Sequence, residues 1–187
     1  MPKNKRYAMV IDARKCVGCM SCMATCKMEN AVPFESFRAW VDMEERGAFP
    51  NVRRAFLPRQ CNHCENAPCI SACPTGASYR SDEGVVLVDG NKCIGCGYCA
   101  IACPYSARFM NSQKRIADKC NYCAERSNPD EDPACVRSCM GKARMFGDLN
   151  DPDSPVHAAC TLEPVQVLNP EFGTKPQVFY IGADMSE

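Results

Sequence analysis

The sequence predicts an α+β fold with short strands, short helices and much loop, arranged as two repeated modules. Three observations predict it. The 187 residues include 17 cysteines but only 8% aromatic residues, so an apolar core has little material and cross-links are expected to support it. Sixteen of the cysteines fall into four groups of four. Fourteen prolines interrupt the chain, which makes long regular elements unfavourable.

Cysteine spacing defines the groups. In chain order they are Cys16, Cys19, Cys22 and Cys26; Cys61, Cys64, Cys69 and Cys73; Cys93, Cys96, Cys99 and Cys103; and Cys120, Cys123, Cys135 and Cys139. The first and third have the spacing C-x2-C-x2-C-x3-C, which with a following proline is the bacterial ferredoxin signature. Three thiolates two residues apart can wrap one corner of a 4Fe–4S cube, and the fourth, about one helical turn later, faces the neighbouring cube. The groups therefore predict four 4Fe–4S clusters.

The sequence around the cysteines repeats as well. Residues 9–12 and 86–89 are short β-type stretches that lead to a lysine and the first cysteine of a group. Residues 74–77, 104–107 and 140–143 are similar to one another and follow the last cysteine of theirs. Such repeats indicate repeated supersecondary units, each a strand, a cluster loop and a short helix. The predicted architecture is two ferredoxin-like modules with two clusters each.

Zinc and disulfides are the alternative cross-links. C-x2-C pairs also build zinc sites, but zinc gains nothing from a third cysteine two residues on, so the triplets that begin at Cys16 and Cys93 disfavour it. The fourth group, two separated pairs, would fit zinc if it stood alone. Disulfides belong to secreted domains with a leader, and residues 1–6 are polar and basic with no apolar segment behind them. Cys160, outside the groups, is expected not to be a ligand, and His63 to pack or hydrogen-bond.

Charge and hydropathy exclude other classes of function. The formal net charge is zero, and sixteen thiolates with four oxidised cubes of charge +2 would bring it to about −8. A basic face for nucleic acid is therefore not expected. No apolar run approaches the roughly 18 residues that span a bilayer. Every motif serves a cluster, and no catalytic dyad or nucleotide-binding glycine loop is seen, so the sequence predicts an electron relay without catalytic activity.

The residues around the cysteines also resemble a known family. The segments that carry the resemblance are 7–12, 16–19, 26–30, 61–69, 73–77 and 146–152. Over about residues 5 to 155, the chain resembles the four-cluster iron–sulfur subunits of molybdenum oxidoreductases of the dimethyl-sulfoxide-reductase family. It is most similar to the small subunits of polysulfide and thiosulfate reductases, with those of tetrathionate and arsenate reductases close behind.

The resemblance implies ligand sets that cross between groups. The sets would be Cys16, Cys19, Cys22 and Cys139; Cys120, Cys123, Cys135 and Cys26; Cys61, Cys64, Cys69 and Cys103; and Cys93, Cys96, Cys99 and Cys73. Residues 1–30 with 114–150 would form the first module and 58–113 the second, with 31–57 as an insertion or interface and 151–187 as a tail packing on a partner. The first-triplet cube would lie nearest the molybdenum subunit and the third-triplet cube at the far end. Some relatives replace the cysteine at the position of Cys96 and hold a 3Fe–4S cluster, so a full cube is expected here. Met140 stands where proline often follows the last cysteine.

The resemblance further implies the role and the partners. The chain would relay electrons between a quinone-linked integral membrane subunit and a molybdopterin catalytic subunit of a respiratory reductase for polysulfide, thiosulfate, tetrathionate, arsenate or a similar acceptor. It would be membrane-associated through its partner, on the outer face of the cytoplasmic membrane, exported with a partner that bears the signal; the cytoplasmic face is the alternative. A subunit of a hydrogenase or formate dehydrogenase is the competing function, disfavoured because the tail at 164–187 is short and mixed. A zinc-stabilised interaction module is the remote one.

Overall fold

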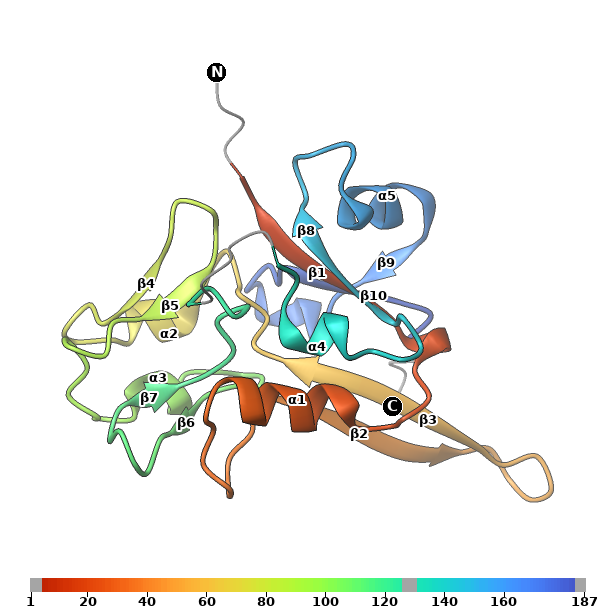
Figure 1. Ribbon diagram of the computed structural model, residues 1–187, viewed down its shortest axis with the longest axis horizontal. Helices are drawn as coiled ribbons and strands as arrows, with labels where there is room; N and C mark the ends of the chain where they lie inside the picture. The colour runs from red at the N-terminus through yellow and green to blue at the C-terminus, as the bar shows by residue number, and fades with distance from the viewer. Residues whose placement is uncertain (1–4, 126–130, 184–187) are drawn as a thin grey trace.

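A computed structural model describes residues 5–125 and 131–183, and it confirms the predicted α+β fold of short elements (Figure 1). The strands are β1 (Tyr7–Asp12), β2 (Ala39–Arg46), β3 (Arg53–Gln60), β4 (Ser78–Arg80), β5 (Val86–Val88), β6 (Phe109–Met110), β7 (Ala117–Asp118), β8 (Arg144–Asp148), β9 (Val165–Gln166) and β10 (Val178–Ile181). The α-helices are α1 (Ser21–Glu29), α2 (Pro68–Ser71), α3 (Tyr98–Ile101), α4 (Ala134–Arg137) and α5 (Pro155–Leu162), and the 3-10 helices are η1 (Ala13–Lys15) and η2 (Pro170–Phe172).

A four-stranded sheet in the order β8-β1-β10-β9 forms the centre of the fold. Strand β1 pairs antiparallel with β8 and parallel with β10. Residues 8–11 of β1 are completely buried, because the neighbouring elements cover both faces of this inner strand, and this explains its unbroken apolar run. Helix α1 packs against α4 beside this sheet. The segment that leads into the first cysteine triplet and the segment that follows the fourth group therefore lie together.

Two small hairpins, β4–β5 and β6–β7, flank the second and third cysteine groups, and α2 packs against α3 between them. In Figure 1 these elements lie together on one side of the molecule. The predicted module boundary between residues 113 and 114 cuts the β6–β7 hairpin. In this hairpin Phe109 pairs with Asp118, and the division of the chain into modules stays a prediction.

The long β2–β3 hairpin occupies most of the predicted insertion and extends away from the other elements (Figure 1). Its two strands pair in register from Ala39 with Gln60 to Arg46 with Arg53. Its base is tied to the central sheet, since the Tyr180 hydroxyl donates a 2.9 Å hydrogen bond to the Pro58 carbonyl oxygen. The insertion is therefore anchored at its base and exposed at its tip, where Phe49 is 93% exposed.

Residues after 150 pack into the chain's own core. That this segment also packs on a partner stays a prediction. Strands β9 and β10 complete the central sheet, and Val178 and Tyr180 are fully buried. Helix α5 packs on β8 and β1. The parallel pairing of β10 with β1 joins residues far apart in the sequence, which a local pattern does not reveal. Among the described residues, no helix is long and apolar enough to cross a membrane.

We predict that Tyr180→Ala lowers the free energy of unfolding by about 3–5 kcal/mol, the range for truncating a large buried aromatic side chain. The substitution removes both the ring and the bond to Pro58. The measurement is the guanidinium midpoint for loss of visible cluster absorbance. Tyr79→Ala, at a side chain that is 43% exposed, is the control. Equal midpoints for the two variants would contradict the prediction.

Candidate metal centres

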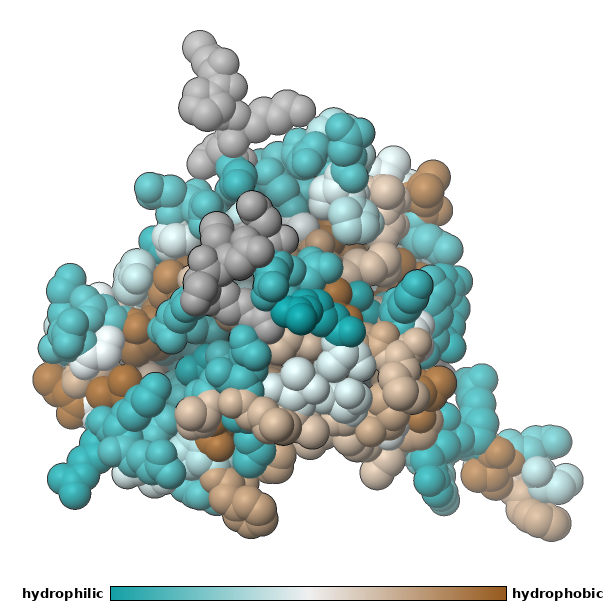
Figure 2. Space-filling view, in the orientation of Figure 1, coloured by the Kyte–Doolittle hydropathy of each residue, from teal (hydrophilic) through white to brown (hydrophobic). Residues whose placement is uncertain are grey.

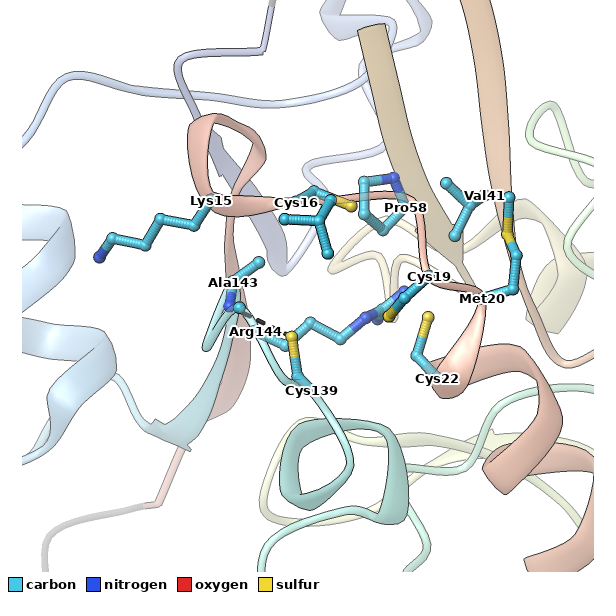
Figure 3. A pocket seen from close by; sticks show the side chains of 12 residues that line it. Lys15, Cys16, Cys19, Met20, Cys22, Val41, Pro58, Cys139, Ala143 and Arg144 are labelled. Carbon is cyan, nitrogen blue, oxygen red and sulfur yellow. Dashed lines mark hydrogen bonds between the residues drawn. The ribbon is translucent and has the colours of Figure 1, made fainter. Parts of the chain in front are cut away.

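Four thiols, which we call the Cys16 set, line one pocket between α1 and β8. Cys16 and Cys19 come from the loop that joins η1 to α1, Cys22 comes from the first turn of α1, and Cys139 comes from the loop between α4 and β8. Figure 3 shows the sulfur atoms of Cys16, Cys22 and Cys139 around this space. Apolar side chains, among them Met20 and Val41, complete the wall. The structure therefore brings a cysteine more than a hundred residues away to the first triplet.

Cys139 reaches the pocket of the Cys16 set because two backbone segments approach each other closely. A Cβ at Gly141 would lie 2.3 Å from the carbonyl oxygen of Lys15, so only glycine lets the loop after Cys139 touch the loop before Cys16. The backbone N–H of Ala143 donates to the Cys139 sulfur at 3.2 Å. That donor suits a thiolate, because hydrogen bonds to a charged acceptor are stronger than those to a neutral one.

A second set, the Cys26 set, consists of Cys26, Cys120, Cys123 and Cys135. Burial raises the pKa of Cys26 to about 12, and the charges of Cys135 and Cys123 contribute to the rise. Burial also raises the pKa of Cys120 well above its usual value, and the charges of Cys26 and Cys135 add to the rise. The last cysteine of the first group therefore lies among three cysteines of the fourth.

The Cys61 set consists of Cys61, Cys64, Cys69 and Cys103. Burial raises the pKa of Cys64 to about 12, and the neighbouring thiols of Cys61, Cys69 and Cys103 add to the shift. A hydrogen bond involving Thr174 opposes it. Here too, the final cysteine of one group lies with the triplet of another.

The other four cysteines of the four groups, Cys73, Cys93, Cys96 and Cys99, form the Cys73 set. The β4–β5 hairpin links its two segments, since the N–H of Asp89 donates to the Ala77 carbonyl and that of Cys93 to the Asp89 carbonyl. Backbone N–H groups also point at its sulfurs: Ser78 donates to Cys73, and Ala117 to Cys93, both at 3.4 Å. Burial acts to raise the pKa of Cys73, but hydrogen bonds from Ser78 and Thr75 outweigh it and lower the pKa to about 7.

The donor chemistry of the four sets fits 4Fe–4S cubes. All 17 cysteines lie within the described residues and none forms a disulfide. Buried thiols with raised pKa values become thiolates when a metal binds them. A cube takes its thiolates at four separated corners, and four thiols line the pocket of the Cys16 set. When bound, each cluster accepts and releases one electron.

Two buried arginines lie between pairs of sets, and the sequence pattern did not reveal them. Arg144 approaches the sulfurs of Cys22 and Cys135 and hydrogen-bonds to the Gln60 side chain; Figure 3 shows it extending past Cys139 toward Cys22. Arg108 approaches Cys69 and Cys99 and donates to the Ser78 hydroxyl at 2.8 Å. In each case burial alone lowers the pKa, and the nearby thiolates reverse the direction.

The signal that could have found these arginines is the repeat itself. Arg108 follows Cys103 by five residues, and Arg144 follows Cys139 by five. The two positions are therefore equivalent in the two modules. Each module places one cation between its two cluster sites.

An aromatic stack joins the two modules. His63 lies between Cys61 and Cys64, Tyr122 lies between Cys120 and Cys123, and their ring centroids are 3.8 Å apart with an interplanar angle of 22°. His63 is fully buried and its Nδ1 accepts from the N–H of Val86 at 3.1 Å, which confirms that it packs and hydrogen-bonds. Burial lowers the pKa of His63 well below its usual value. The ligand loops of the Cys61 and Cys26 sets thus meet ring to ring.

A buried ammonium group reinforces this junction. Lys119 Nζ donates to the carbonyl oxygen of Cys120 at 2.6 Å and to that of Val86. Burial lowers the pKa of Lys119, and the thiolates of Cys61 and Cys120 act in the opposite direction. The residue thus lies near sulfurs of both the Cys61 set and the Cys26 set.

Comparison with known proteins agrees with these sites. One 4Fe–4S dicluster domain family matches residues 52–149, and a second 4Fe–4S dicluster domain family matches residues 15–77. Over 96% of its length the chain is 45% identical to the B subunit of tetrathionate reductase from Salmonella typhimurium, covering 73% of that protein. It is 46% identical to the B subunit of tetrathionate reductase from Archaeoglobus fulgidus over 97% of this chain and 84% of that protein. It is 44% identical to the B subunit of sulfite dehydrogenase from Allochromatium vinosum over 94% of this chain and 82% of that protein.

The fold, the four sets of thiols and the two dicluster matches define an iron–sulfur electron-transfer protein whose cofactors are four 4Fe–4S clusters. More particularly, the chain belongs to the 4Fe–4S dicluster family of iron–sulfur B subunits of molybdenum-containing oxidoreductases. It is an electron-transfer subunit and leaves substrate chemistry to another chain. The resemblance inferred from the sequence is confirmed.

We predict that Gly95→Ala damages the third cysteine loop more than Gly97→Ala does. Both glycines have positive φ, +72° and +79°, so alanine is strained at either by about 1–2 kcal/mol. A Cβ at Gly95 would also lie 2.6 Å from the Arg115 carbonyl oxygen, whereas nothing lies within 4 Å of one at Gly97. Iron per chain after anaerobic purification is the measurement. Gly95→Ala should lose about four iron atoms, one cube, and Gly97→Ala should retain them; equal iron contents would contradict this.

Proposed function

We propose that this chain carries electrons through its four clusters between a molybdopterin catalytic subunit and a quinone-linked membrane subunit of a respiratory reductase. The observation that carries the proposal is the similarity along nearly the whole chain to the B subunits of two tetrathionate reductases, at 45% and 46% identity. A tetrathionate-type sulfur oxyanion is therefore the favoured class of terminal substrate, and its chemistry belongs to the catalytic partner.

The proposed ligands of the four cubes are the Cys16, Cys26, Cys61 and Cys73 sets as defined above. The shared pocket of the Cys16 set supports this assignment, as do the thiol neighbours in the Cys26 and Cys61 sets. Cys160 is proposed not to be a ligand. It lies on α5, away from the four sets, and burial alone raises its pKa.

Contacts between the sets support one order for electron transfer. Arg144 lies between the Cys16 and Cys26 sets, and the His63–Tyr122 stack joins the Cys26 and Cys61 sets. Arg108 lies between the Cys61 and Cys73 sets. The proposed path is therefore the Cys16 cube, the Cys26 cube, the Cys61 cube and the Cys73 cube.

Exposure supports the same two ends. Of the 17 cysteines, all within the described residues, two are exposed: Cys19 in the Cys16 set and Cys96 in the Cys73 set. The cysteines nearest the stack, such as Cys61 and Cys120, are buried. A relay needs its terminal clusters near the surface, where partners dock, and its inner clusters shielded.

Apolar surface surrounds both proposed ends. Val17 and Met140 are 61% and 74% exposed in the loops of the Cys16 set, and Ile94 and Ile101 are 68% and 84% exposed beside the Cys73 set. Figure 2 shows apolar side chains at the edge of the molecule beside α2 and α3, and also at the tip of the β2–β3 hairpin. Exposed apolar patches of this kind typically bury against partners. We propose that the catalytic subunit docks at the first end and the membrane subunit at the second, on the outer face of the cytoplasmic membrane.

We predict that the tagged chain, purified anaerobically from its native host, contains about 16 iron atoms per chain, the content of four cubes, with negligible zinc and about one molybdenum per complex. Elemental analysis checks all three metals at once. Full iron without molybdenum in an intact complex would contradict the proposed partner and favour a hydrogenase. A tungsten or molybdenum complex that oxidises formate would favour formate dehydrogenase. Stoichiometric zinc with little iron would overturn the relay.

We predict that Cys139→Ser removes or converts one cluster, with a loss of about one to four iron atoms, whereas Cys160→Ser keeps the full iron content. The electron paramagnetic resonance (EPR) change of Cys139→Ser should match that of Cys16→Ser, because both thiols are assigned to one cube. Cys135→Ser should alter a different cluster. Matching spectra for Cys139→Ser and Cys135→Ser would refute the crossed assignment.

A further inference from the structure

The side chain of Asn30, at the C-terminal end of α1, points at two sulfur atoms of the Cys26 set. Its amide nitrogen lies 3.7 Å from Cys26 Sγ and 3.9 Å from Cys123 Sγ, and it also donates to the Cys26 carbonyl oxygen at 2.9 Å. An amide nitrogen carries two hydrogens. With one on the carbonyl, the other is shared between the two sulfurs.

A buried arginine fixes which end of this amide faces the cluster site. Arg38, 8% exposed, donates from Nη1 to Asn30 Oδ1 at 2.7 Å and to Asn121 Oδ1 at 3.1 Å. A guanidinium group has donors and no acceptor, so the Asn30 oxygen must turn toward Arg38. The nitrogen is then held toward the sulfurs.

Asp118 completes this clamp. Its Oδ1 lies 2.7 Å from Arg38 Nη2, and both side chains are more than nine-tenths buried. The second carboxylate oxygen accepts from Asn111 Nδ2 at 3.0 Å. Three segments therefore meet here: the end of α1, the segment before β2, and β7. Because removing one member of a buried ion pair is costly, the arrangement is rigid.

An asparagine at this position is found in only one of the four cysteine groups. Asn30 follows the last cysteine of its group by four residues, and the three equivalent positions are Ala77, Ala107 and Ala143. At Ala143 the backbone N–H itself donates to the Cys139 sulfur. Helix α1 continues to Glu29, so the backbone N–H of Asn30 is used on the Cys26 carbonyl oxygen. The side chain supplies the donor that the backbone cannot.

We infer that Asn30 raises the reduction potential of the cluster held by the Cys26 set, and that Arg38 is its positioning residue. Reduction adds one electron and makes the sulfurs more negative, so a donor to two of them stabilises the reduced state more than the oxidised one. The positive charge of Arg38 acts in the same direction. This inference rests on the proposed ligand assignment.

The test is an EPR-monitored redox titration of the purified complex, with iron content measured on the same samples. Asn30→Leu should lower one of the four midpoint potentials by about 59 mV, which is a tenfold change for a one-electron couple, and leave the other three in place. Asn30→Asp, which keeps the shape but removes both donors and adds a negative charge, should lower the same potential further.

Asn66→Leu is the matched control. This asparagine lies between Cys64 and Cys69, but its amide donates to the Gly173 carbonyl oxygen at 3.1 Å. All four potentials should stay unchanged. Full iron with four unshifted potentials in Asn30→Leu would overturn the inference and leave the relay intact, whereas low iron in the unaltered complex would overturn the proposed function itself.

Arg38→Met tests the positioning role. It should lower the same single potential, and in the Asn30→Leu background its additional effect should be smaller, because the amide it orients is gone. A second measurement uses the unaltered protein, so that the inference can still be tested if a variant fails to assemble. Pulsed EPR of the reduced complex with ¹⁵N in asparagine side chains should show nitrogen coupling to a cluster, and the absence of that coupling would overturn the inference.

Discussion

Each cube needs four thiolates, yet a tight loop supplies only three, so the fourth must come from elsewhere in the chain. The rest of the structure depends on this constraint. Cys139 reaches the first triplet because Gly141 passes against the Lys15 carbonyl and because β8 pairs with β1. The same need explains why the strands are short. They bring loops together and do not build a large core.

Thiolates that bind clusters bring many negative charges into the interior, and buried cations nearby offset part of this charge. The formal net charge of the chain is zero, but three of its cations, Arg108, Lys119 and Arg144, are buried among the thiols. Each lies close to the sulfurs of two different sets. A cation in such a place favours the charged form of the ligands on both sides.

The two modules meet through aromatic rings, whereas buried cations lie between the cluster sites within each module. Cys61-Asn62-His63-Cys64 and Cys120-Asn121-Tyr122-Cys123 are equivalent loops, and their third residues stack against each other. Tyr122 also packs against Phe146 of β8. The junction is therefore an aromatic contact continuous with the core of the first module. It holds the loop of the Cys61 set against the loop of the Cys26 set.

Cysteine spacing and the flanking repeats alone predicted the fold class and the four clusters, because each motif is local and a triplet of thiolates binds a cube at short fixed intervals. The family was predicted from the resemblance of the residues around the cysteines. Asn30 and Arg38 could not be assigned from such a pattern, since their roles arise from contacts with residues of other segments. The pairing of β10 with β1 could not be predicted either, because the sequence of a short apolar strand does not indicate which strand it pairs with. Only the tertiary structure decided these points, because burial, orientation and charge at a cluster depend on what the folded chain brings together.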